Sequence, residues 1–370
     1  MKIGIDAKWF YSRSNPSGSV VVRNIVEGIT KLITDDVFYV FLDKNDIDKE
    51  FPYQKENIIL VYVWCRINLF SNVFVLPFYI KKFKIDVFMF QNFNSPFCNC
   101  KKIVYIHDVM YYTNPEFFTF KERFYLHPLK WMQYNCDQII TISENEKKRL
   151  ISLGFQHADK ITVVYHGVND VFKPLNEFDS VLIDKVRTIY SLPSEYILYV
   201  GRLNIRKNIV KLLEAIPLLE NKNIKLVIVG SADETSINFY NILRELNISN
   251  RVMILGYTPF DHLPSIYALA KVFCFPSLEE GFGMPPLESM ASNVPVIVSN
   301  TSCMPEICGD SALYFNPQFS LEISKSINKI LNSDKLHSEL ALKGVAHAKK
   351  FKWSSSVNLI YKQLKNHNKL

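Results

Sequence analysis

The chain has 370 residues, of which 48% are hydrophobic and 21% charged, proportions that are ordinary for a globular protein. This length predicts two domains of roughly 150–200 residues each. The formal net charge of +7 at pH 7 is spread over both halves, which excludes the concentrated basic tail or domain of a nucleic-acid-binding protein. A mild positive excess is compatible with a phosphorylated substrate or an anionic membrane surface.

Short β-branched and aromatic runs alternate with longer amphipathic segments along the whole chain. We expect a helix at residues 19–32, where apolar side chains recur at helical spacing. The strands expected in the first half are residues 2–6, 37–42, 58–64, 86–90, 103–107, 138–142 and 161–165. A second series is expected at residues 196–200, 225–229, 252–255, 272–275, 294–298 and 312–315, followed only by helices at 321–331, 336–350 and 353–364. Such alternation predicts an α/β protein with two doubly wound, Rossmann-like parallel sheets.

The two series of strands are separated by residues 169–195, which contain Pro174, Pro193 and one expected short helix. The predicted domains are therefore residues 1–170 and residues 171–350, with residues 351–370 as a C-terminal helix. Doubly wound domains bind ligands at the carboxyl ends of their strands. Two such edges facing each other would form a deep cleft. The ligand-binding and catalytic side chains are then expected in the loops that follow the strands.

Other features argue against a disulfide-rich or membrane-spanning protein. The seven cysteines are an odd number without a C-x-x-C pair, which favours reduced thiols in a cytoplasmic protein. No apolar leader opens the chain, and the longest apolar stretch, residues 67–80, is too short to span a bilayer. Residues 76–84 combine aromatic and lysine side chains that suit a membrane surface, but an ordinary helix leading into the next strand is the favoured interpretation.

The strongest motif is residues 276–291, which follow the expected strand 272–275. Gly281 and Gly283 let the backbone approach a ligand closely, and a helix is expected from the double proline that follows, with its free N–H groups directed at the loop. Glu280 before the turn and Glu288 in the first helical turns can face the same ligand. A bare glycine-rich turn with a helix-stabilising glutamate would explain each carboxylate alone, but it does not explain their combination.

This stretch resembles the E-x7-E element of the retaining glycosyltransferases of family four, which a P-V-I strand usually follows, as residues 295–297 do here. Asn293 stands where the family usually has glycine, and asparagine tolerates the same left-handed backbone conformation. The resemblance implies that Glu280 contacts the donor sugar and that Glu288 contacts the nucleotide ribose. It also implies that main-chain amides contact the sugar hydroxyls at Gly281, Phe282, Gly283 and Met284.

Three cations, Arg202, Arg206 and Lys207, follow the expected strand 196–200 before a helix. Because Arg binds pairs of oxygen atoms and Lys acts as a point charge, this set suits a diphosphate. A solvated basic helix start is the plain alternative, although cations at a helix N-terminus are unfavourable without an anion. The segment resembles the family's G-R-L…K-N phosphate clamp, in which Arg202 and Lys207 take the matching positions and Arg206 is a third candidate.

A third motif has His107 and Asp108 at the end of an expected strand in the first domain. A lone histidine at such a place is about as often structural as functional. The stretch resembles the family's I-H-D element followed by N-P-E-x-F, here residues 114–118. In the family this region lies beside the reacting sugar on the acceptor side, which makes His107 and Asp108 candidate catalytic residues. His166 replaces the usual asparagine of the family's N-G-V element, so the family's role for this position is not carried over to it.

The N-terminal loop, residues 14–19, resembles the family's G-x-G loop near the donor phosphates, with Gly18 as the one matching glycine. A role of Ser19 as a simple helix N-cap explains the same loop equally well. The resemblance runs from about residue 3 to about residue 353. It implies the GT-B fold, in which two Rossmann-like domains face each other across a cleft and the C-terminal helix packs back toward the N-terminal domain.

The resemblance also implies a glycosyltransferase that moves a hexose, with retention of configuration, from a nucleotide-sugar donor to a glycan or lipid-linked glycan acceptor. The H-D…N-P-E-F-F-T and R-K-N stretches look closest to bacterial mannosyltransferases of surface-polysaccharide and lipopolysaccharide biosynthesis, so GDP-mannose is the favoured donor. No D-x-D metal motif is expected near either cleft edge, so we expect no metal and no cofactor. We expect a cytoplasmic protein that has no nucleic-acid partner, and peripheral contact with an anionic membrane is also compatible with the sequence.

Two other functions are compatible with the same motifs. A nucleotide-sugar epimerase or hydrolase on a related scaffold would need a dedicated acid–base set in the cleft. A non-catalytic subunit that only binds nucleotide sugar would not need the complete set of Glu280, Glu288, Arg202 and Lys207. Nucleotide release that requires an acceptor would indicate transfer, whereas isomerisation of the sugar without release would indicate an epimerase.

Overall fold

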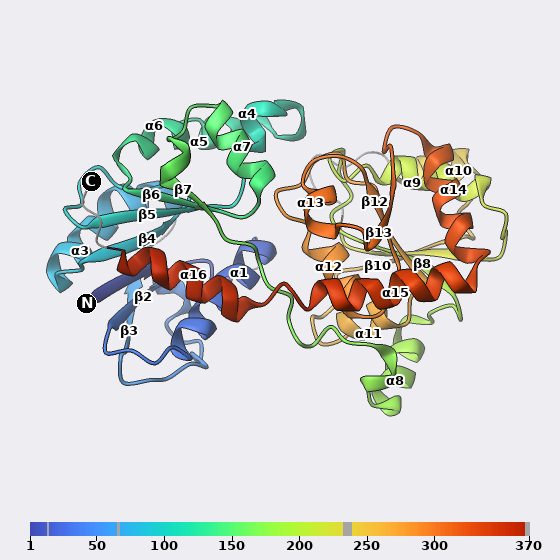
Figure 1. Cartoon of the computed structure of the whole chain (residues 1–370), viewed down its shortest axis with the longest axis horizontal. Coiled ribbons are helices and arrows are strands. Elements are labelled where there is room, and N and C mark those ends of the chain that lie inside the picture. The colour runs from blue at the N-terminus through green and yellow to red at the C-terminus, as the bar shows by residue number, and fades with distance from the viewer. Residues whose placement is uncertain (13–14, 65–66, 232–238, 367–370) are drawn as a thin grey trace. The chain divides into compact units, whose positions relative to one another are not determined.

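The computed structural model describes residues 1–12, 15–64, 67–231 and 239–366, so Ser14 of the N-terminal loop, Cys65 and the last four residues of the expected C-terminal segment lie outside the described residues. The chain divides into two compact units (Figure 1). Unit 1 comprises Met1–Thr113, Phe120–Gly167 and Trp353–Leu370, and unit 2 comprises Asn114–Thr119 and Val168–Lys352.

Unit 1 is built on a seven-stranded parallel sheet in the order β3-β2-β1-β4-β5-β6-β7. The strands are β1 Lys2–Asp6, β2 Val37–Asp43, β3 Ile58–Val63, β4 Val87–Gln91, β5 Lys101–Ile106, β6 Gln138–Thr141 and β7 Ile161–Val163. The order reverses between β1 and β4, because the chain adds strands first on one side of β1 and then on the other. This arrangement confirms the doubly wound sheet expected from the sequence.

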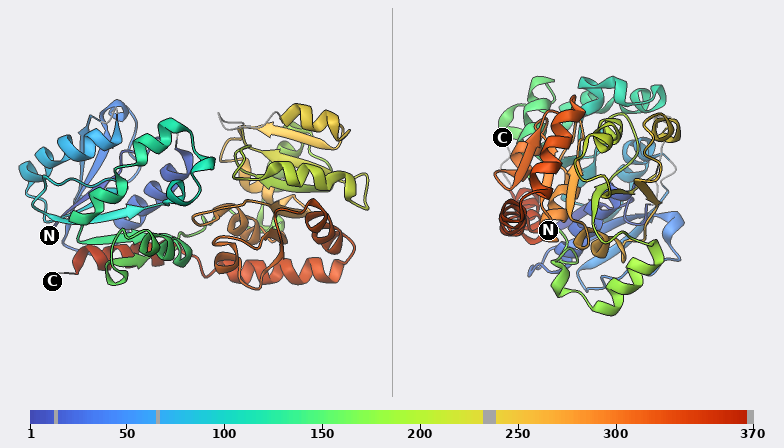
Figure 2. Two further views of the ribbon diagram at one scale, coloured as in Figure 1. Left: turned by 90° about the horizontal axis from the view of Figure 1, so that it is seen from above. Right: turned by 90° about the vertical axis from the view of Figure 1, so that its right-hand side faces the viewer.

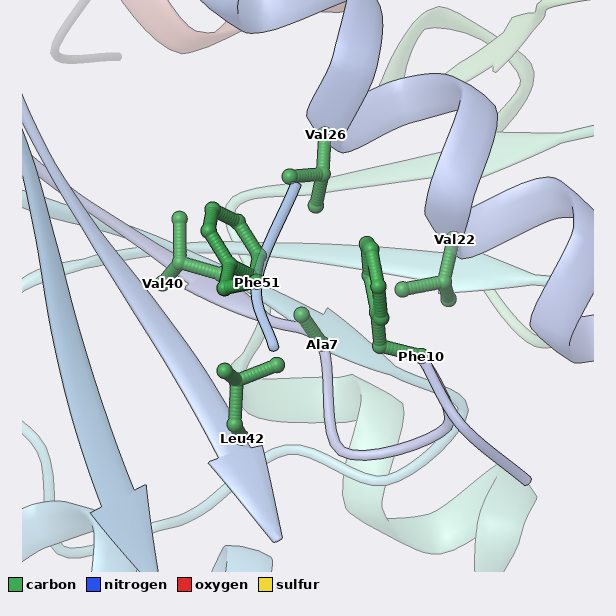
Figure 3. Close-up of a cluster of buried hydrophobic side chains, with 7 residues drawn as sticks. All are labelled: Ala7, Phe10, Val22, Val26, Val40, Leu42 and Phe51. Atoms are coloured by element: carbon green, nitrogen blue, oxygen red, sulfur yellow. The ribbon is translucent and has the colours of Figure 1, made fainter. Parts of the chain in front are cut away.

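Helices cover the sheet of unit 1 on both faces (Figure 2). They are α1 Pro16–Thr30, α2 Asn68–Phe70, α3 Leu76–Phe83, α4 Met110–Thr113, α5 Phe120–Leu126, α6 Leu129–Met132 and α7 Glu144–Ser152, with short turns η1 Lys44–Asp46, η4 Gln133–Asn135, η5 Ala158–Lys160 and the π-helical turn η2 Ser71–Val75. One cluster of the core lies where α1 packs on the first two strands (Figure 3). Its members are Ala7, Phe10, Val22, Val26, Val40, Leu42 and Phe51.

Unit 2 repeats the architecture with a six-stranded parallel sheet in the order β10-β9-β8-β11-β12-β13. The strands are β8 Tyr196–Val200, β9 Lys225–Val229, β10 Val252–Gly256, β11 Val272–Phe275, β12 Val296–Ser299 and β13 Ala312–Phe315. The helices are α8 Ser180–Tyr190, α9 Ile209–Ala215, α10 Phe239–Glu245, α11 Leu263–Ala268, α12 Met284–Ala291, α13 Met304–Cys308, α14 Ser320–Leu331 and α15 Asp334–Ala348, with short turns η3 Pro115–Phe117, η6 Leu175–Glu177 and η7 Ile216–Leu218. The second doubly wound sheet is thus also confirmed.

The last helix, α16 (Trp353–Lys365), packs on unit 1, as the sequence led us to expect. A Cβ atom at Gly28 of α1 would lie 2.4 Å from Cγ2 of Val357, so the close approach of α16 to α1 requires glycine there. The hydroxyl of Tyr361 donates a hydrogen bond to Asp36 over 2.6 Å. These contacts fasten the C-terminal helix to α1 and to the residue that precedes β2.

The start of α1 differs from the expected one. The helix begins at Pro16, and its N-cap is Asn15, whose side chain accepts a hydrogen bond from the amide of Gly18 over 3.1 Å. Ser19 is therefore not an N-cap, and its hydroxyl instead donates to the main-chain oxygen of Phe10. Within the described ranges, no helix combines the length and the apolar character that crossing a membrane requires.

Candidate active site

The sheet of unit 2 brings the two strongest sequence motifs together. Its strand order reverses between β8 and β11, which are direct neighbours. In doubly wound sheets, ligands bind outside the carboxyl ends of the strands at such a reversal. The loop after β8 carries Arg202, Arg206 and Lys207, and the loop after β11 carries Glu280. The topology alone therefore makes residues that are some 70 positions apart in sequence meet at one edge.

Glu280 lies at the centre of this edge and is 7% exposed. Lys207 Nζ donates to its Oε1 over 2.6 Å, and Arg206 Nη1 lies 3.1 Å from its Oε2. The hydroxyl of Ser277 donates to the same Oε1 over 2.5 Å. The Lys207 ammonium also lies 4.7 Å from the centre of the Phe275 ring. The plain alternative of a solvated basic helix start is therefore wrong for Lys207, whose anionic partner is a carboxylate of this same chain.

The electrostatics of this cluster favour a buried ion pair at neutral pH. Burial alone would raise the pKa of Glu280, but Arg206 and Lys207 outweigh burial and lower it to about 2. Burial lowers the pKa of Lys207 to about 8, and the attraction of Glu280 opposes that change. A diphosphate arriving at this edge would thus meet two cations that already bind a carboxylate, so its binding requires these cations to be shared or released.

Hydrogen bonds between the two loops fix the position of this cluster. Arg206 Nη1 donates to the main-chain oxygen of Glu279 over 2.7 Å, and the amide of Leu278 donates to the main-chain oxygen of Arg206 over 2.9 Å. Asn208 Nδ2 donates to the main-chain oxygen of Pro276 over 3.1 Å. The side chain of Arg202, in contrast, is exposed. The structure therefore gives Arg206 a tighter connection to Glu280 than its position in the clamp motif suggested.

The turn between Glu280 and helix α12 depends on Gly283. This residue is the N-cap of α12 with φ 95°, and a Cβ atom there would lie 2.4 Å from Cε of Met304. Glycine is required both by this backbone conformation and by this approach. Met284 is the first residue of the helix, as the double proline predicted to within two residues. The neighbouring Phe282 buries its ring in the core, 6.0 Å from the ring of Phe351.

Glu288 lies one turn further into α12 and has a different environment. Its Oε2 accepts a hydrogen bond from the hydroxyl of Tyr267 over 2.8 Å. Burial raises the pKa of Glu288 to about 7, and the Tyr267 hydrogen bond only partly opposes this rise. The two glutamates of the E-x7-E element therefore differ in the direction of their pKa change. Glu280 is ionised at neutral pH, whereas burial favours the protonated form of Glu288.

In unit 1 the third motif lies at the carboxyl edge of the sheet, where His107 directly follows β5. Its Nε2 lies 2.9 Å from Oε1 of Gln91, the last residue of the neighbouring strand β4. Its ring also lies 5.6 Å from the ring of Trp9 and 6.4 Å from that of His166. Burial lowers the pKa of His107 to about 4 and that of His166 to about 3. Both imidazoles are therefore neutral under ordinary conditions.

Sequence reasoning missed several polar residues at this edge. Gln91 is 1% exposed, and Lys8 Nζ binds Asp6 Oδ1 over 2.6 Å in a pair that is almost fully buried. Asn72 completes the group, because its Oδ1 accepts from Lys8 over 2.7 Å. A usable signal was present in the sequence. Asp6 and Gln91 are the polar last residues of two mostly apolar strands on either side of the strand-order reversal.

The predicted site residues thus fall into two groups. The structure joins three of them directly: Arg206, Lys207 and Glu280. In the same loops or helix of unit 2 lie Arg202, Gly281, Phe282, Gly283, Met284 and Glu288. In unit 1 lie Gly18, His107 and Asp108. Gly18 lies inside the first turn of α1, and Asp108 is partly exposed directly after His107.

No metal centre is evident in the part of the chain that the structure describes, where no group of three or more His, Cys, Asp and Glu residues is arranged to hold an ion. Sequence reasoning passed over one D-x-D spacing, Asp46 and Asp48, in the segment after β2. Asp46 forms an ion pair with Lys49 over 2.5 Å in this segment.

Comparison with known proteins identifies the class of protein. Residues 19–172 match the family model described as Glycosyltransferase Family 4, and residues 185–345 match that described as Glycosyl transferases group 1. The first match lies mostly in unit 1 and the second lies in unit 2. The architecture of two parallel-sheet units is that of the GT-B glycosyltransferases. The chain is therefore a glycosyltransferase, with each of the two family models matching one part of it.

Individual relatives and solved structures that resemble the chain are more specific than the family models. The chain is 28% identical over 287 residues to O-antigen chain mannosyltransferase B of Escherichia coli, which covers 75% of this chain and 73% of that protein. It is also 28% identical over 268 residues to the serotype-specific mannosyltransferase WbdA of Escherichia coli, of whose length the match spans only 32%. The crystal structure of Anabaena HepE in complex with UDP and glucose matches with a TM-score of 0.77 over 98% of this chain and 99% of that chain. At 17% identity this last likeness concerns the fold.

Proposed function

We propose that this glycosyltransferase transfers mannose from GDP-mannose, with retention of configuration, to a glycan or lipid-linked glycan in surface-polysaccharide biosynthesis. The observation that carries the proposal is the contact of Glu280 with Arg206 and Lys207 at the reversal of the sheet in unit 2. The choice of mannose and of a polysaccharide acceptor draws on the names of the two Escherichia coli relatives. The neutral His107 of unit 1 is proposed to act on the acceptor side.

The proposed chemistry follows from where charge develops during transfer. As the bond between the anomeric carbon and the diphosphate oxygen breaks, negative charge grows on the diphosphate and positive charge grows on the sugar ring. Arg206 and Lys207 can stabilise the first, together with the main-chain amides at the start of α12. The ionised Glu280 can stabilise the second. Arg206 and Lys207 supply positive charge for the departing diphosphate without a divalent ion, so we propose that no metal is needed.

We propose a cytoplasmic location, which the free cysteines support, and contact with the inner face of the plasma membrane, which the proposed acceptor implies. The cysteines within the described residues are free thiols, Cys98, Cys100, Cys136, Cys274, Cys303 and Cys308. Free thiols are typical of reducing compartments. A lipid-linked acceptor would also bring the enzyme to a membrane surface.

The proposal is tested with purified protein, a panel of GDP-mannose, UDP-glucose and ADP-glucose, and a mannose-containing lipid-linked acceptor. We expect release of nucleoside diphosphate to require the acceptor, to be fastest with GDP-mannose and to continue in excess EDTA. Nuclear magnetic resonance of the product should show the same anomeric configuration as the donor. The Glu280→Gln variant is the control, because it should abolish release while its fold is retained.

Each other outcome would contradict a definite part of the proposal. Isomerised sugar without release would indicate an epimerase, and release that ignores the acceptor would indicate a hydrolase. Binding without turnover would indicate a non-catalytic subunit. Activity that EDTA removes and only added Mg²⁺ restores would contradict the metal-independent mechanism.

A further inference from the structure

A row of exposed aromatic side chains lies along the helical segment 68–83 of unit 1. Phe70, Phe74 and Phe78 recur every four residues, and the latter two are 57% and 65% exposed. The ring centres of Phe70 and Phe74 lie 5.0 Å apart. Phe97, from the connection between β4 and β5, stacks on Phe74 at 5.9 Å and is 63% exposed. We call these four residues the aromatic ridge.

Internal packing does not account for the exposure of the ridge. The opposite face of α3 is well packed, because Leu76 and Ile80 are buried against the sheet. The ring of Phe83, which also faces inward, lies 5.1 Å from that of Tyr39 on β2. The helix therefore already has the apolar face that its fold requires. A second, contiguous apolar face on the outside is typical of a surface that another body covers.

The ridge is fixed in place rather than formed by loose side chains. Asn72, in the π-helical turn η2, donates to the main-chain oxygen of Phe93 over 2.6 Å. The hydroxyl of Ser95 donates to the main-chain oxygen of Val73 over 2.9 Å. Both hydrogen bonds tie the β4–β5 connection to the helical segment, so Phe97 is held beside Phe74. Single π-helical turns inside helices occur frequently at functional sites.

The charged residues of the segment that carries the ridge are of one sign. The sequence from residue 64 to residue 85 contains no Asp or Glu. Lys81, Lys82 and Lys84 are all exposed at the C-terminal end of α3. Trp64 is 45% exposed beside the other end of the ridge, with its ring 5.7 Å from that of Phe70. Aromatic rings beside lysines match the apolar boundary and the anionic headgroups of a bilayer.

We propose that the aromatic ridge and the three lysines after it dock the protein onto an anionic phospholipid bilayer. The rings enter the boundary between headgroups and acyl chains, and the lysines bind the headgroup phosphates. A second copy of the chain is a poorer occupant, because self-association would bring like charges together. This inference does not rest on the donor or the acceptor of the proposed reaction.

Vesicle sedimentation tests the apolar part of the surface. The full chain is mixed with vesicles of phosphatidylglycerol and phosphatidylcholine that contain no glycan acceptor. We expect the double variant Phe74→Ser/Phe78→Ser to bind at least tenfold more weakly than the parent protein. The matched control is Phe319→Ser, which removes a phenylalanine that is 53% exposed at the start of α14 in unit 2, and its binding should equal that of the parent. Thermal unfolding confirms that each variant is folded.

The charged part has its own matched pair of variants. Lys81→Glu/Lys82→Glu should weaken binding to anionic vesicles about tenfold or more. Lys325→Glu/Lys329→Glu, on exposed positions of α14, makes the same change of net charge and should leave binding almost unchanged. The fluorescence of the parent should shift to the blue on vesicle addition, and Trp64→Phe should reduce that shift.

Three results would overturn the proposal. The first is the absence of vesicle binding by the parent protein. The second is unchanged vesicle binding by Phe74→Ser/Phe78→Ser. If vesicle binding were lost only on changing the exposed Phe120 and Phe124 of α5, that helix would be the docking surface instead. The third is a concentration-dependent dimer in sedimentation velocity that Phe74→Ser/Phe78→Ser abolishes, because the ridge would then bind a second copy. The first result would also contradict the membrane contact of the proposed function, but none of the three bears on the transfer reaction, so transfer and membrane docking can fail separately.

Discussion

The pKa values of the two glutamates of the E-x7-E element are shifted in opposite directions, and the variant Glu288→Gln tests the rise at Glu288. The pKa of Glu288 rises from an ordinary 4.5 to about 7, because burial disfavours its charged form. A carboxyl group whose pKa is higher in the folded than in the unfolded state stabilises the fold only while it is protonated. Its contribution to the free energy of unfolding is therefore complete below pH 4.5 and is lost as the pH rises through about 7.

The size of this effect follows from the same pKa change. Each tenfold change in proton affinity corresponds to about 1.4 kcal/mol, so the rise at Glu288 corresponds to about 3 kcal/mol. Glutamine keeps the acceptor oxygen for the Tyr267 hydroxyl but carries no charge at any pH. Relative to the parent protein, Glu288→Gln should therefore be nearly neutral at pH 4.5 and stabilising by up to about 3 kcal/mol at pH 8.

Urea denaturation of both proteins at several pH values between 4.5 and 8 measures this difference. Groups other than Glu288 titrate in both proteins, so they cancel when the two free energies of unfolding are subtracted. Glu245→Gln, at an exposed position of α10, controls for the loss of one formal charge. A difference that stays flat from pH 4.5 to pH 8 would refute the argument, because Glu288 would then not be kept from ionising by burial.

Two further predictions concern the ion pair and the histidine. We expect both Lys207→Met and Glu280→Gln to destabilise the protein. Lys207→Met should cost about 3 kcal/mol, because it leaves the buried Glu280 carboxylate without its nearest cation. The double variant should lose less than the sum of the two, and strictly additive losses in urea denaturation would contradict the pairing. Gln91→Glu should raise the pKa of His107 above about 4, because a carboxylate beside Nε2 stabilises the imidazolium. Proton NMR of the His107 ring measures this value, and an unchanged pKa would mean that the two side chains do not touch in solution.

Much of the fold could be predicted because buried parallel strands have a simple pattern. Strands β8, β9, β11 and β13 coincide with the expected ranges, since strands covered on both faces are short, nearly continuous apolar runs. The start of α1 could not be placed as well, because Ser19 and Asn15 both have side chains that can cap a helix. Only the structure shows that Asn15 takes that role and that Pro16 opens the helix.

The candidate site could be predicted as a set of residues but not as a set of contacts. The motifs identified Lys207 and Glu280 separately and assigned them to different parts of a ligand. Their direct contact depends on the neighbouring positions of β8 and β11, which no local pattern contains. The aromatic ridge could not be predicted from the sequence either, because both faces of residues 68–83 are apolar. Spacing alone cannot tell which of Phe78 and Ile80 faces the sheet.

The position of α16 has a consequence for the order in which the protein is made. Unit 1 is assembled from both ends of the chain, whereas nearly all of unit 2 lies in one continuous stretch between them. A ribosome therefore finishes unit 2 before the segment that covers Gly28 on α1 has emerged. Because domains fold as units during synthesis, the half of the protein that is translated first is the one that is completed last. Until then, the face of α1 that awaits Val357 stays uncovered on the nascent chain.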